Sequence, residues 1–113
     1  MIGQAIEWAP FKLREDVPEV TLIEASLRMQ VEFLNQQPGF QRRELLKLAP
    51  GNFVDLVWWE TRAAAEAMMR IAGEHQVCVD YFGLMQFDAP PPGAGAGEGG
   101  VTHLIQLATY PGR

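Results

Sequence analysis

Hydrophobic and polar positions alternate along several short stretches of the chain, and this period of two predicts β-strands. Strands are expected over residues 4–13, 40–48 and 53–60, with a last strand in 101–110, VTHLIQLATY. The turn sequence APGN between the second and third stretches predicts an antiparallel hairpin. Pro10 has no N–H to donate, so we expect the ladder of the first strand to end or bulge there.

The period changes to that of an α-helix in the segment DVPEVTLIEASLRMQVEFLNQQPGF, which begins at residue 16. Asp16 is expected to cap this helix, with Glu19 three residues later, and Pro38 and Gly39 should end it. The apolar positions that follow at helical spacing are Val20, Ile23, Leu27, Val31 and Leu34.

A second helical segment, TRAAAEAMMRIAG, is expected to begin after a Thr61 cap and to weaken or end at Gly73. The following residues, EHQVCVDYFGLMQ, read as another helical piece. The aligned apolar positions are an inner stripe of Ala64, Met68 and Ile71 with Ala67 beside it, and then Val77, Tyr81 and Leu84.

The order strand, helix, strand, strand, helix, strand predicts an α+β fold of the ferredoxin-like βαββαβ type. Its four-stranded antiparallel sheet would carry both helices on one face, with the first and third strands in the middle. Residues 88–100, DAPPPGAGAGEGG, offer almost no apolar surface to bury and are expected to be a flexible connector. Residues 1–113 are therefore expected to form a single domain.

The stretch FVDLVWWE, residues 53–60, is apolar on both faces, which is unusual for a strand in so small a protein. The helices would cover one face, but the face of Val54, Leu56 and Trp58 would have no element of the chain to cover it. We therefore expect a homodimer in which two sheets pack face to face.

Composition narrows the function classes. The 113 residues are 48% apolar and 20% charged, as in a folded globular domain, and the formal net charge of -5 argues against nucleic acid as a partner. The single cysteine, Cys78, excludes an internal disulfide and is expected to be a buried thiol. No run approaches the length needed to cross a membrane, and the chain has no signal-peptide pattern, so a cytoplasmic location without membrane partners is expected.

Three runs, FLNQQPGFQRRELLK, FVDLVWWETRAAAEAM and VDYFGLMQ, give the sequence a family likeness. With its Q-P-G-F turn and its D-x-V-x-W-E-[ST] strand end, the chain resembles the antibiotic-biosynthesis-monooxygenase-like group of dimeric α+β barrel proteins. The resemblance implies a pocket between helices and sheet in which a small aromatic or polyketide-like molecule is bound or oxidised. It implies an oxygenase reaction that needs neither a metal nor a cofactor.

The resemblance also places Asp55 and Trp59 on the helix side of the sheet. His75 falls seven residues after Met68 and would continue the inner stripe if that helix extended past Gly73. An Asp55 carboxylate that oriented the His75 imidazole would make a catalytic pair. The expected ligand-binding residues around this pair are Trp59, Glu7, Tyr81 and Met68.

Simpler interpretations remain open for the same residues. Asp55 could pair with Arg42 or Arg43 across the hairpin, His75 could cap helix carbonyls, and Trp59 could be core packing. Haem degradation is disfavoured, because the positions that would hold its tryptophan and histidine carry Met68 and Cys78. The alternative function is a non-catalytic dimeric barrel that binds a small ligand or has a structural role.

Overall fold

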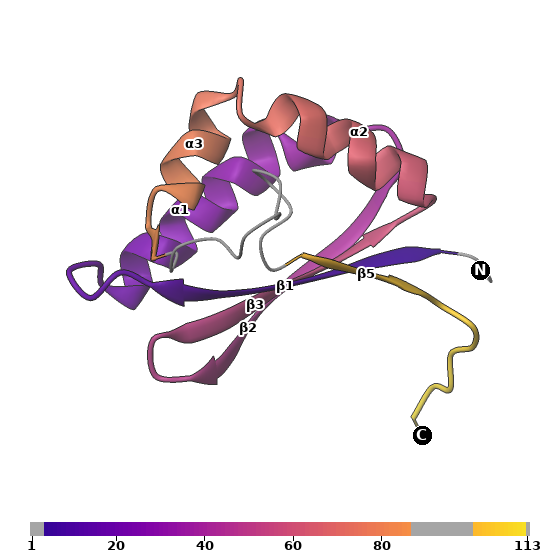
Figure 1. Cartoon of the computed structure of the whole chain (residues 1–113), viewed down its shortest axis with the longest axis horizontal. Coiled ribbons are helices and arrows are strands. Elements are labelled where there is room, and N and C mark those ends of the chain that lie inside the picture. Colours follow the sequence, from indigo (N-terminus) through magenta and orange to yellow (C-terminus); the bar gives the residue numbers. More distant parts are fainter. Residues whose placement is uncertain (1–3, 87–100, 113) are drawn as a thin grey trace, which may run out of the picture.

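The computed structural model describes residues 4–86 and 101–112. A single antiparallel sheet has the strand order β2-β3-β1-β4, and β5 also pairs with β1 (Figure 1). Its strands are β1 (Ala5–Leu13), β2 (Phe40–Ala49), β3 (Asn52–Trp59), β4 (Met85–Gln86) and β5 (Thr102–Ile105). The predicted hairpin is β2–β3, and the first and third strands lie in the middle of the sheet as expected.

The first strand does not end or bulge at Pro10, so that prediction was wrong. Pro10 pairs in unbroken register with Val54 of β3. On the other side of β1, pairing with β5 covers Ala5–Trp8 and pairing with β4 begins only at Lys12. Pro10 lies in the interval between these two partners, where no described strand requires an N–H from it.

The helices all lie on one face of the sheet, as Figure 1 shows. They are α1 (Glu19–Glu32), the 3₁₀ turn η1 (Leu34–Gln36), α2 (Arg62–Ala72) and α3 (Gln76–Phe82). This arrangement confirms the predicted ferredoxin-like α+β fold. Thr61 caps α2 as expected, because its hydroxyl accepts a hydrogen bond from the Ala64 N–H at 3.1 Å. Asp16 does not cap α1, which begins after Pro18.

The regular apolar stripe of α1 faces outward and not toward the sheet. Val20, Ile23, Leu27 and Val31 are all more than half exposed, and of the predicted set only Leu34, in η1, is buried. The side chains that α1 buries are Leu22, Ser26 and Met29. The spacing therefore predicted the helix correctly but did not identify the face that packs against the core.

The second helical region is divided differently from the prediction. Helix α2 ends at Ala72 with Gly73 as its C-cap, and its buried residues are Ala65, Met68 and Ala72. Only Met68 of the expected inner stripe is buried, while Ile71 is 37% exposed. The expected second piece contains the seven-residue α3 and then the short strand β4, which pairs with the end of β1.

The core lies between the helix layer and the sheet. Trp59, Tyr81 and Phe33 are its largest fully buried side chains, contributed by β3, α3 and the C-cap of α1. Phe11 of β1 stacks on Phe53 of β3 with ring centroids 5.7 Å apart, and it meets the edge of Tyr81 at 6.2 Å. These aromatic contacts connect the two central strands to α3.

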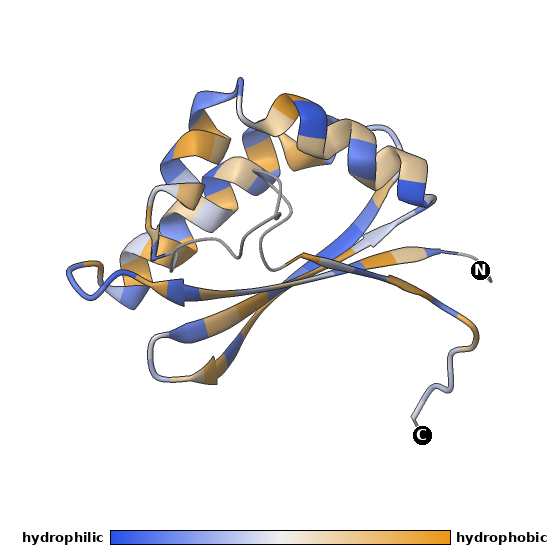
Figure 2. Cartoon of the chain, in the orientation of Figure 1, coloured by the Kyte–Doolittle hydropathy of each residue, from blue (hydrophilic) through white to orange (hydrophobic). Residues whose placement is uncertain are grey.

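The opposite face of the sheet carries hydrophobic side chains that the described residues leave partly open. Hydrophobic residues recur along both the strands and the helices, as the colouring in Figure 2 shows. Trp8, Leu46 and Leu104 are each about two-fifths exposed, although Val54 is fully buried. The Arg42 guanidinium lies 4.6 Å from the Trp58 ring centroid and also pairs with Glu44. The face is thus apolar at several points but is partly covered by its own side chains.

The predicted connector, 88–100, lies outside the described residues. No helix in residues 4–86 or 101–112 combines the length and the apolar character that a membrane span requires.

Candidate functional site

The helix-facing side of the sheet carries a row of side chains that runs across four strands. Strand register places Arg43 of β2 opposite Val57 of β3, Val57 opposite Glu7 of β1, and Glu7 opposite His103 of β5. Partners directly opposite each other in antiparallel strands share a face, with Cβ atoms about 5 Å apart. Asp55 lies on the same face, one pleat further along β3.

Asp55 is held by two partners in the core. The Arg43 Nε–H donates to Oδ1 at 3.1 Å, and Tyr81 O–H donates to Oδ2 at 2.5 Å. Arg43 Nη2 lies 3.0 Å from the same Oδ1, at an angle that leaves this nitrogen without a directed hydrogen bond. The side chains of Arg43 and Asp55 are only 6% and 10% exposed. Both carboxylate oxygens are therefore engaged by the scaffold.

Arg43 is itself positioned by two other elements. Its Nη1 donates to the Ser26 carbonyl of α1 at 3.3 Å, and its guanidinium lies 5.2 Å from the centroid of the Tyr81 ring. Arg43 of β2 therefore contacts residues of β3, α1 and α3 through a single side chain. Of the two arginines that the sequence offered as partners for Asp55, the structure selects Arg43.

Burial and charge set the protonation of this cluster. Burial raises the pKa of the Asp55 carboxyl, while the Arg43 charge and the hydrogen bonds from Tyr81 and Arg43 oppose that shift. Burial, followed by the neighbouring Asp55 charge, raises the pKa of Tyr81 far above its usual range. Tyr81 is therefore a neutral hydrogen-bond donor at physiological pH.

Glu7 is a buried residue with one carboxyl oxygen that accepts no hydrogen bond from the described residues. It is 3% exposed, and its Oε1 has no hydrogen-bond partner among the described residues. Burial raises its pKa to about 7, the Trp59 indole N–H lowers it in part, and the Asp55 charge raises it further. Trp59 Nε1 is close enough to affect the carboxyl but does not reach regular hydrogen-bond geometry. A carboxyl that titrates near neutrality is suited to acid–base chemistry.

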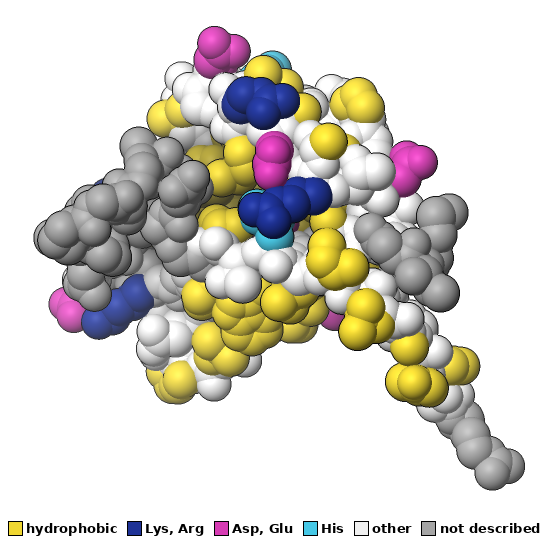
Figure 3. Space-filling model, turned by 45° about the vertical axis from the view of Figure 1, so that its right-hand side comes forward, with side chains coloured by type: hydrophobic (Ala, Val, Ile, Leu, Met, Phe, Trp, Pro, Cys, Tyr) yellow, Lys and Arg dark blue, Asp and Glu magenta, His cyan; other side chains and the backbone are white. Residues whose placement is uncertain are grey.

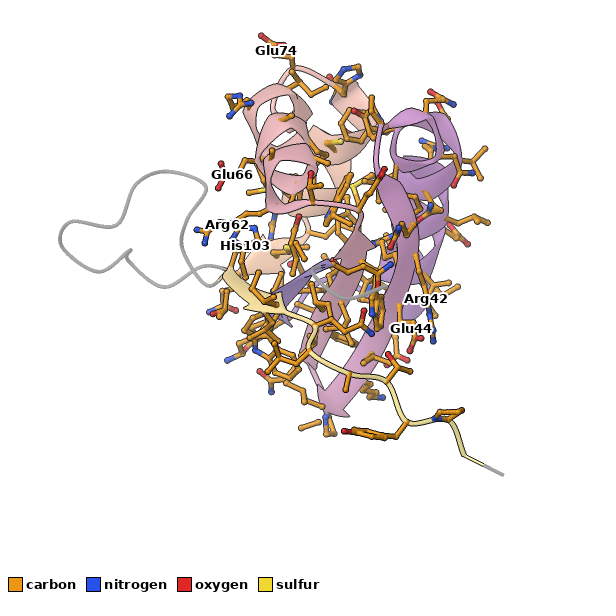
Figure 4. The ribbon with its side chains drawn as sticks, turned by 90° about the vertical axis from the view of Figure 1, so that its right-hand side faces the viewer. Arg42, Glu44, Arg62, Glu66, Glu74 and His103 are labelled. Atoms are coloured by element: carbon orange, nitrogen blue, oxygen red, sulfur yellow. The ribbon has the colours of Figure 1, made fainter. Side chains whose placement is uncertain are left out.

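His103 was missed at the level of sequence and joins the site through β5. It lies opposite Glu7, and its Nε2 is buried without a partner in the part of the chain that the structure describes. Arg62 and Glu66 of α2 lie beside it (Figure 4) and form an ion pair with each other at 3.0 Å. Burial and then the Arg62 charge lower the pKa of His103, and Glu66 opposes them. The only indication that His103 belongs to the site is its position opposite Glu7, and that position follows from the β1–β5 register.

His75 is not a partner of Asp55. Because α2 ends at Ala72, His75 becomes the exposed N-cap residue of α3, and its ring packs 4.6 Å from the Phe33 ring centroid. The expectation that His75 continues the inner stripe of one long helix was wrong, since Gly73 ends that helix. The structure brings together Asp55 and Tyr81 by direct contact, with Glu7 and Trp59 beside them.

Met68 faces a separate surface groove of about 400 Å³ between α2 and the turn before β2. Gly39, in that turn, has a φ of +80° and approaches α2 so closely that a Cβ there would lie 2.7 Å from the Ala64 Cβ. Glycine is therefore required at this point of the Q-P-G-F turn. The groove is lined by Gln37, Pro38, Gly39, Glu60, Ala64, Ala67, Met68 and Ile71.

Within residues 4–86 and 101–112, no group of three or more His, Cys, Asp or Glu side chains is arranged to hold a metal ion. Cys78 is buried, and burial raises the pKa of its thiol to about 11. It is thus an unreactive thiol at neutral pH.

Comparison with solved structures agrees with the fold. SnoaB, a cofactor-independent oxygenase from Streptomyces nogalater, superposes with a TM-score of 0.65 at 15% identity, covering 96% of each chain. The chain shares the ferredoxin-like α+β fold of this oxygenase. A candidate antibiotic biosynthesis monooxygenase from Bordetella bronchiseptica gives a TM-score of 0.70 at 16% identity, covering 94% of this chain and 99% of that one.

A further candidate monooxygenase of this type, from Nitrosomonas europaea, is 20% identical with a TM-score of 0.60, covering 98% of this chain and 95% of that one. No protein-family model and no curated protein sequence matches the chain. At these identities the likeness concerns the fold, and the chemistry must be argued from the side chains.

Proposed function

We propose that the protein binds a small hydroxylated aromatic molecule between its helices and its sheet and removes a proton from it, with Glu7 as the base. The observation that carries this proposal is the Glu7 carboxyl, which is buried, has one oxygen without a partner, and has a pKa of about 7. A base of this kind is ionised in a large fraction of molecules at neutral pH, yet it still accepts a proton readily.

Asp55 is a weaker candidate for the base than the sequence suggested. Its two oxygens already accept hydrogen bonds from Arg43 and Tyr81, so a proton from a substrate would have to displace one of them. In this proposal Asp55 instead acts on Glu7 through its charge, which helps to raise the Glu7 pKa. Tyr81 and Trp59 form the aromatic wall of the proposed ligand site. Met68, a buried residue of α2, is part of the core beneath that helix.

The reaction proposed is the oxygenation of an electron-rich ring without a cofactor. Glu7 takes a proton from the substrate, and the resulting carbanion or phenolate donates electrons to dioxygen. At a ring methylene, one oxygen atom becomes a carbonyl and the other leaves as water with the two hydrogens. The protein contributes the base, an apolar environment and aromatic contacts. The shared fold with SnoaB, a cofactor-independent oxygenase, supports this class of reaction.

Oxygen consumption tests the proposal directly. Purified protein should accelerate oxygen uptake by an anthrone, which has an acidic ring methylene, and Glu7→Gln should reduce the rate by about a hundredfold, the usual contribution of a general base. The matched control is Glu24→Gln, which removes an exposed carboxylate of α1. Equal rates for wild type and Glu7→Gln would refute a role for Glu7 as the base.

One observation favours the non-catalytic alternative. Within the buried Arg43–Asp55–Tyr81 network both oxygens of Asp55 already accept hydrogen bonds, which is what a scaffold requires. The same experiment separates the two functions, because a ligand-binding barrel would bind the anthrone without any increase in oxygen uptake.

A homodimer formed through the open sheet face is part of the proposal. Trp8, Leu46 and Leu104 leave apolar surface on this face, and a second copy of the sheet would bury it. Sedimentation of the purified protein should show a dimer at micromolar concentration, whereas a stable monomer would refute the assembly.

A further inference from the structure

Glu7 and His103 present two unpartnered polar atoms from directly opposite positions on β1 and β5. Glu7 Oε1 and His103 Nε2 are both buried, and neither has a hydrogen-bond partner among the described residues, including each other. Buried polar atoms without partners are uncommon in folded proteins, because each unmade hydrogen bond destabilises the fold by about 1–3 kcal/mol. Glu7 Oε1 and His103 Nε2 lie opposite each other on paired strands. Their position indicates a binding site in which a ligand supplies the missing hydrogen-bond partner.

Trp59 adds a third unpartnered atom. Its Nε1–H is buried and lies near the same Glu7 carboxyl, diagonally across the β1–β3 pair. Indole nitrogen is only a donor, ionised carboxylate is only an acceptor, and imidazole can serve as either. A ligand group that completes the site must therefore both donate and accept. A hydroxyl meets this requirement, whereas an ether oxygen can only accept.

The surroundings favour a neutral hydroxyl over a charged group. Ionised Glu7 disfavours a ligand that arrives as an anion, whereas a neutral hydroxyl can give its proton to Glu7, and the Arg62 charge beside His103 disfavours a cation. In Figure 3, basic, acidic and histidine side chains gather beside a recess with hydrophobic walls between the helix layer and the sheet. Figure 4 shows that Arg62, Glu66 and His103 meet where α2 faces β5. His103, which lies opposite Glu7 in the strand register, connects this surface to the Glu7 carboxyl.

We propose that Glu7, His103 and Trp59 form a hydroxyl-binding site in which one aromatic hydroxyl donates to Glu7 and accepts from His103 or Trp59. This inference rests on the proposed function, because it assumes that an aromatic ligand enters between helices and sheet. It goes further by giving His103 a role and by defining the ligand group that is recognised. His103 positions the hydroxyl, and Glu7 receives its proton.

A matched pair of probes tests the site. Calorimetric titration with 2-naphthol and with its methyl ether, 2-methoxynaphthalene, compares a hydroxyl with a group that cannot donate. Wild type should bind the naphthol about tenfold more tightly, since one charge-assisted hydrogen bond is worth at least that factor. Glu7→Gln and His103→Phe should reduce the preference to near parity. Thr102→Val, on the opposite face of β5, should retain it.

The outcomes separate this inference from the proposed function. If both probes bind wild type equally, or if His103→Phe keeps the preference, the hydroxyl site is refuted while aromatic binding stands. If neither probe binds, the aromatic ligand class and the site are both refuted. Should His103→Phe fail to fold, nitrogen NMR of the His103 ring in wild type decides: addition of 2-naphthol should shift the Nε2 resonance, and no shift refutes the site.

Discussion

Replacing Glu7 with Gln should make the folded protein more stable at alkaline pH. The Glu7 pKa of about 7, against its ordinary value of 4.5, means that folding disfavours the ionised carboxylate. The difference corresponds to about 3 kcal/mol at a pH where the carboxyl is ionised in both folded and unfolded chains. Gln keeps the size of the side chain but cannot ionise, so the variant avoids this loss.

The sign of this change in stability with pH follows from which of the two Glu7 pKa values, folded or unfolded, is higher. Because the folded pKa is raised, the unfolded chain releases the Glu7 proton first as the pH increases. The contribution of Glu7 is therefore fully favourable below about pH 4.5, declines up to about pH 7, and remains at its lowest value above that. Asp55 on β3 and His103 on β5 also face Glu7, but they are present in both proteins and their own titrations largely cancel in the difference.

Urea unfolding followed by far-UV circular dichroism at about pH 4.5 and about pH 8.5 measures this difference. Wild type and Glu7→Gln should have similar free energies of unfolding at the lower pH, and the variant should be more stable by about 3 kcal/mol at the higher one. Glu24→Gln, at an exposed position on α1, should have the same free energy of unfolding as wild type at both pH values. A Glu7→Gln profile parallel to wild type would refute the argument that burial perturbs Glu7.

Other substitutions test the rest of the structure. Tyr81→Phe should lower the free energy of urea unfolding by about 1–3 kcal/mol, because it leaves Asp55 Oδ2 without its buried donor; an unchanged value would contradict the contact. Arg43→Met should lower it by about 3–5 kcal/mol, since Asp55 would become an unpaired buried charge. Arg28→Met, which removes an exposed ion pair with Glu32 on α1, should change it by less than about 1 kcal/mol, and equal effects for the two arginines would exclude a special role for the buried pair. Leu56→Asp should dissociate the proposed dimer in sedimentation experiments, and an unaffected dimer would place the interface elsewhere.

The sequence was sufficient for the first helix, and it was sufficient for the β2–β3 hairpin and the central strands because alternation with a period of two survives in short segments. It did not predict the short strand β4, which lies in a segment expected to be helical. It failed on the faces of the helices. In α1, apolar residues are present on both sides, so spacing alone could not reveal that Leu22 and Met29 are buried while Ile23 and Leu27 are exposed. Which side packs depends on where the sheet lies, which is a tertiary property.

The candidate site was predicted in part. Asp55, Trp59 and Glu7 share the helix-facing side because strand alternation and strand order determine it, and both could be derived. His75 was misplaced because a single residue, Gly73, decides whether a helix continues or ends. His103 was missed because its neighbour Glu7 is almost a hundred residues away in sequence and meets it only through the β1–β5 register.

The titration of the Glu7 carboxyl carbon by NMR, assigned by the loss of its signal in Glu7→Gln, tests the proposed base most directly. A midpoint near pH 7 is expected, together with a change in that midpoint when Asp55 is replaced by Asn, since the Asp55 charge contributes to the raised pKa. A midpoint near the ordinary value of 4.5 would contradict the proposal, because such a carboxylate would be too weak a base to take a proton from an aromatic hydroxyl or ring methylene at neutral pH.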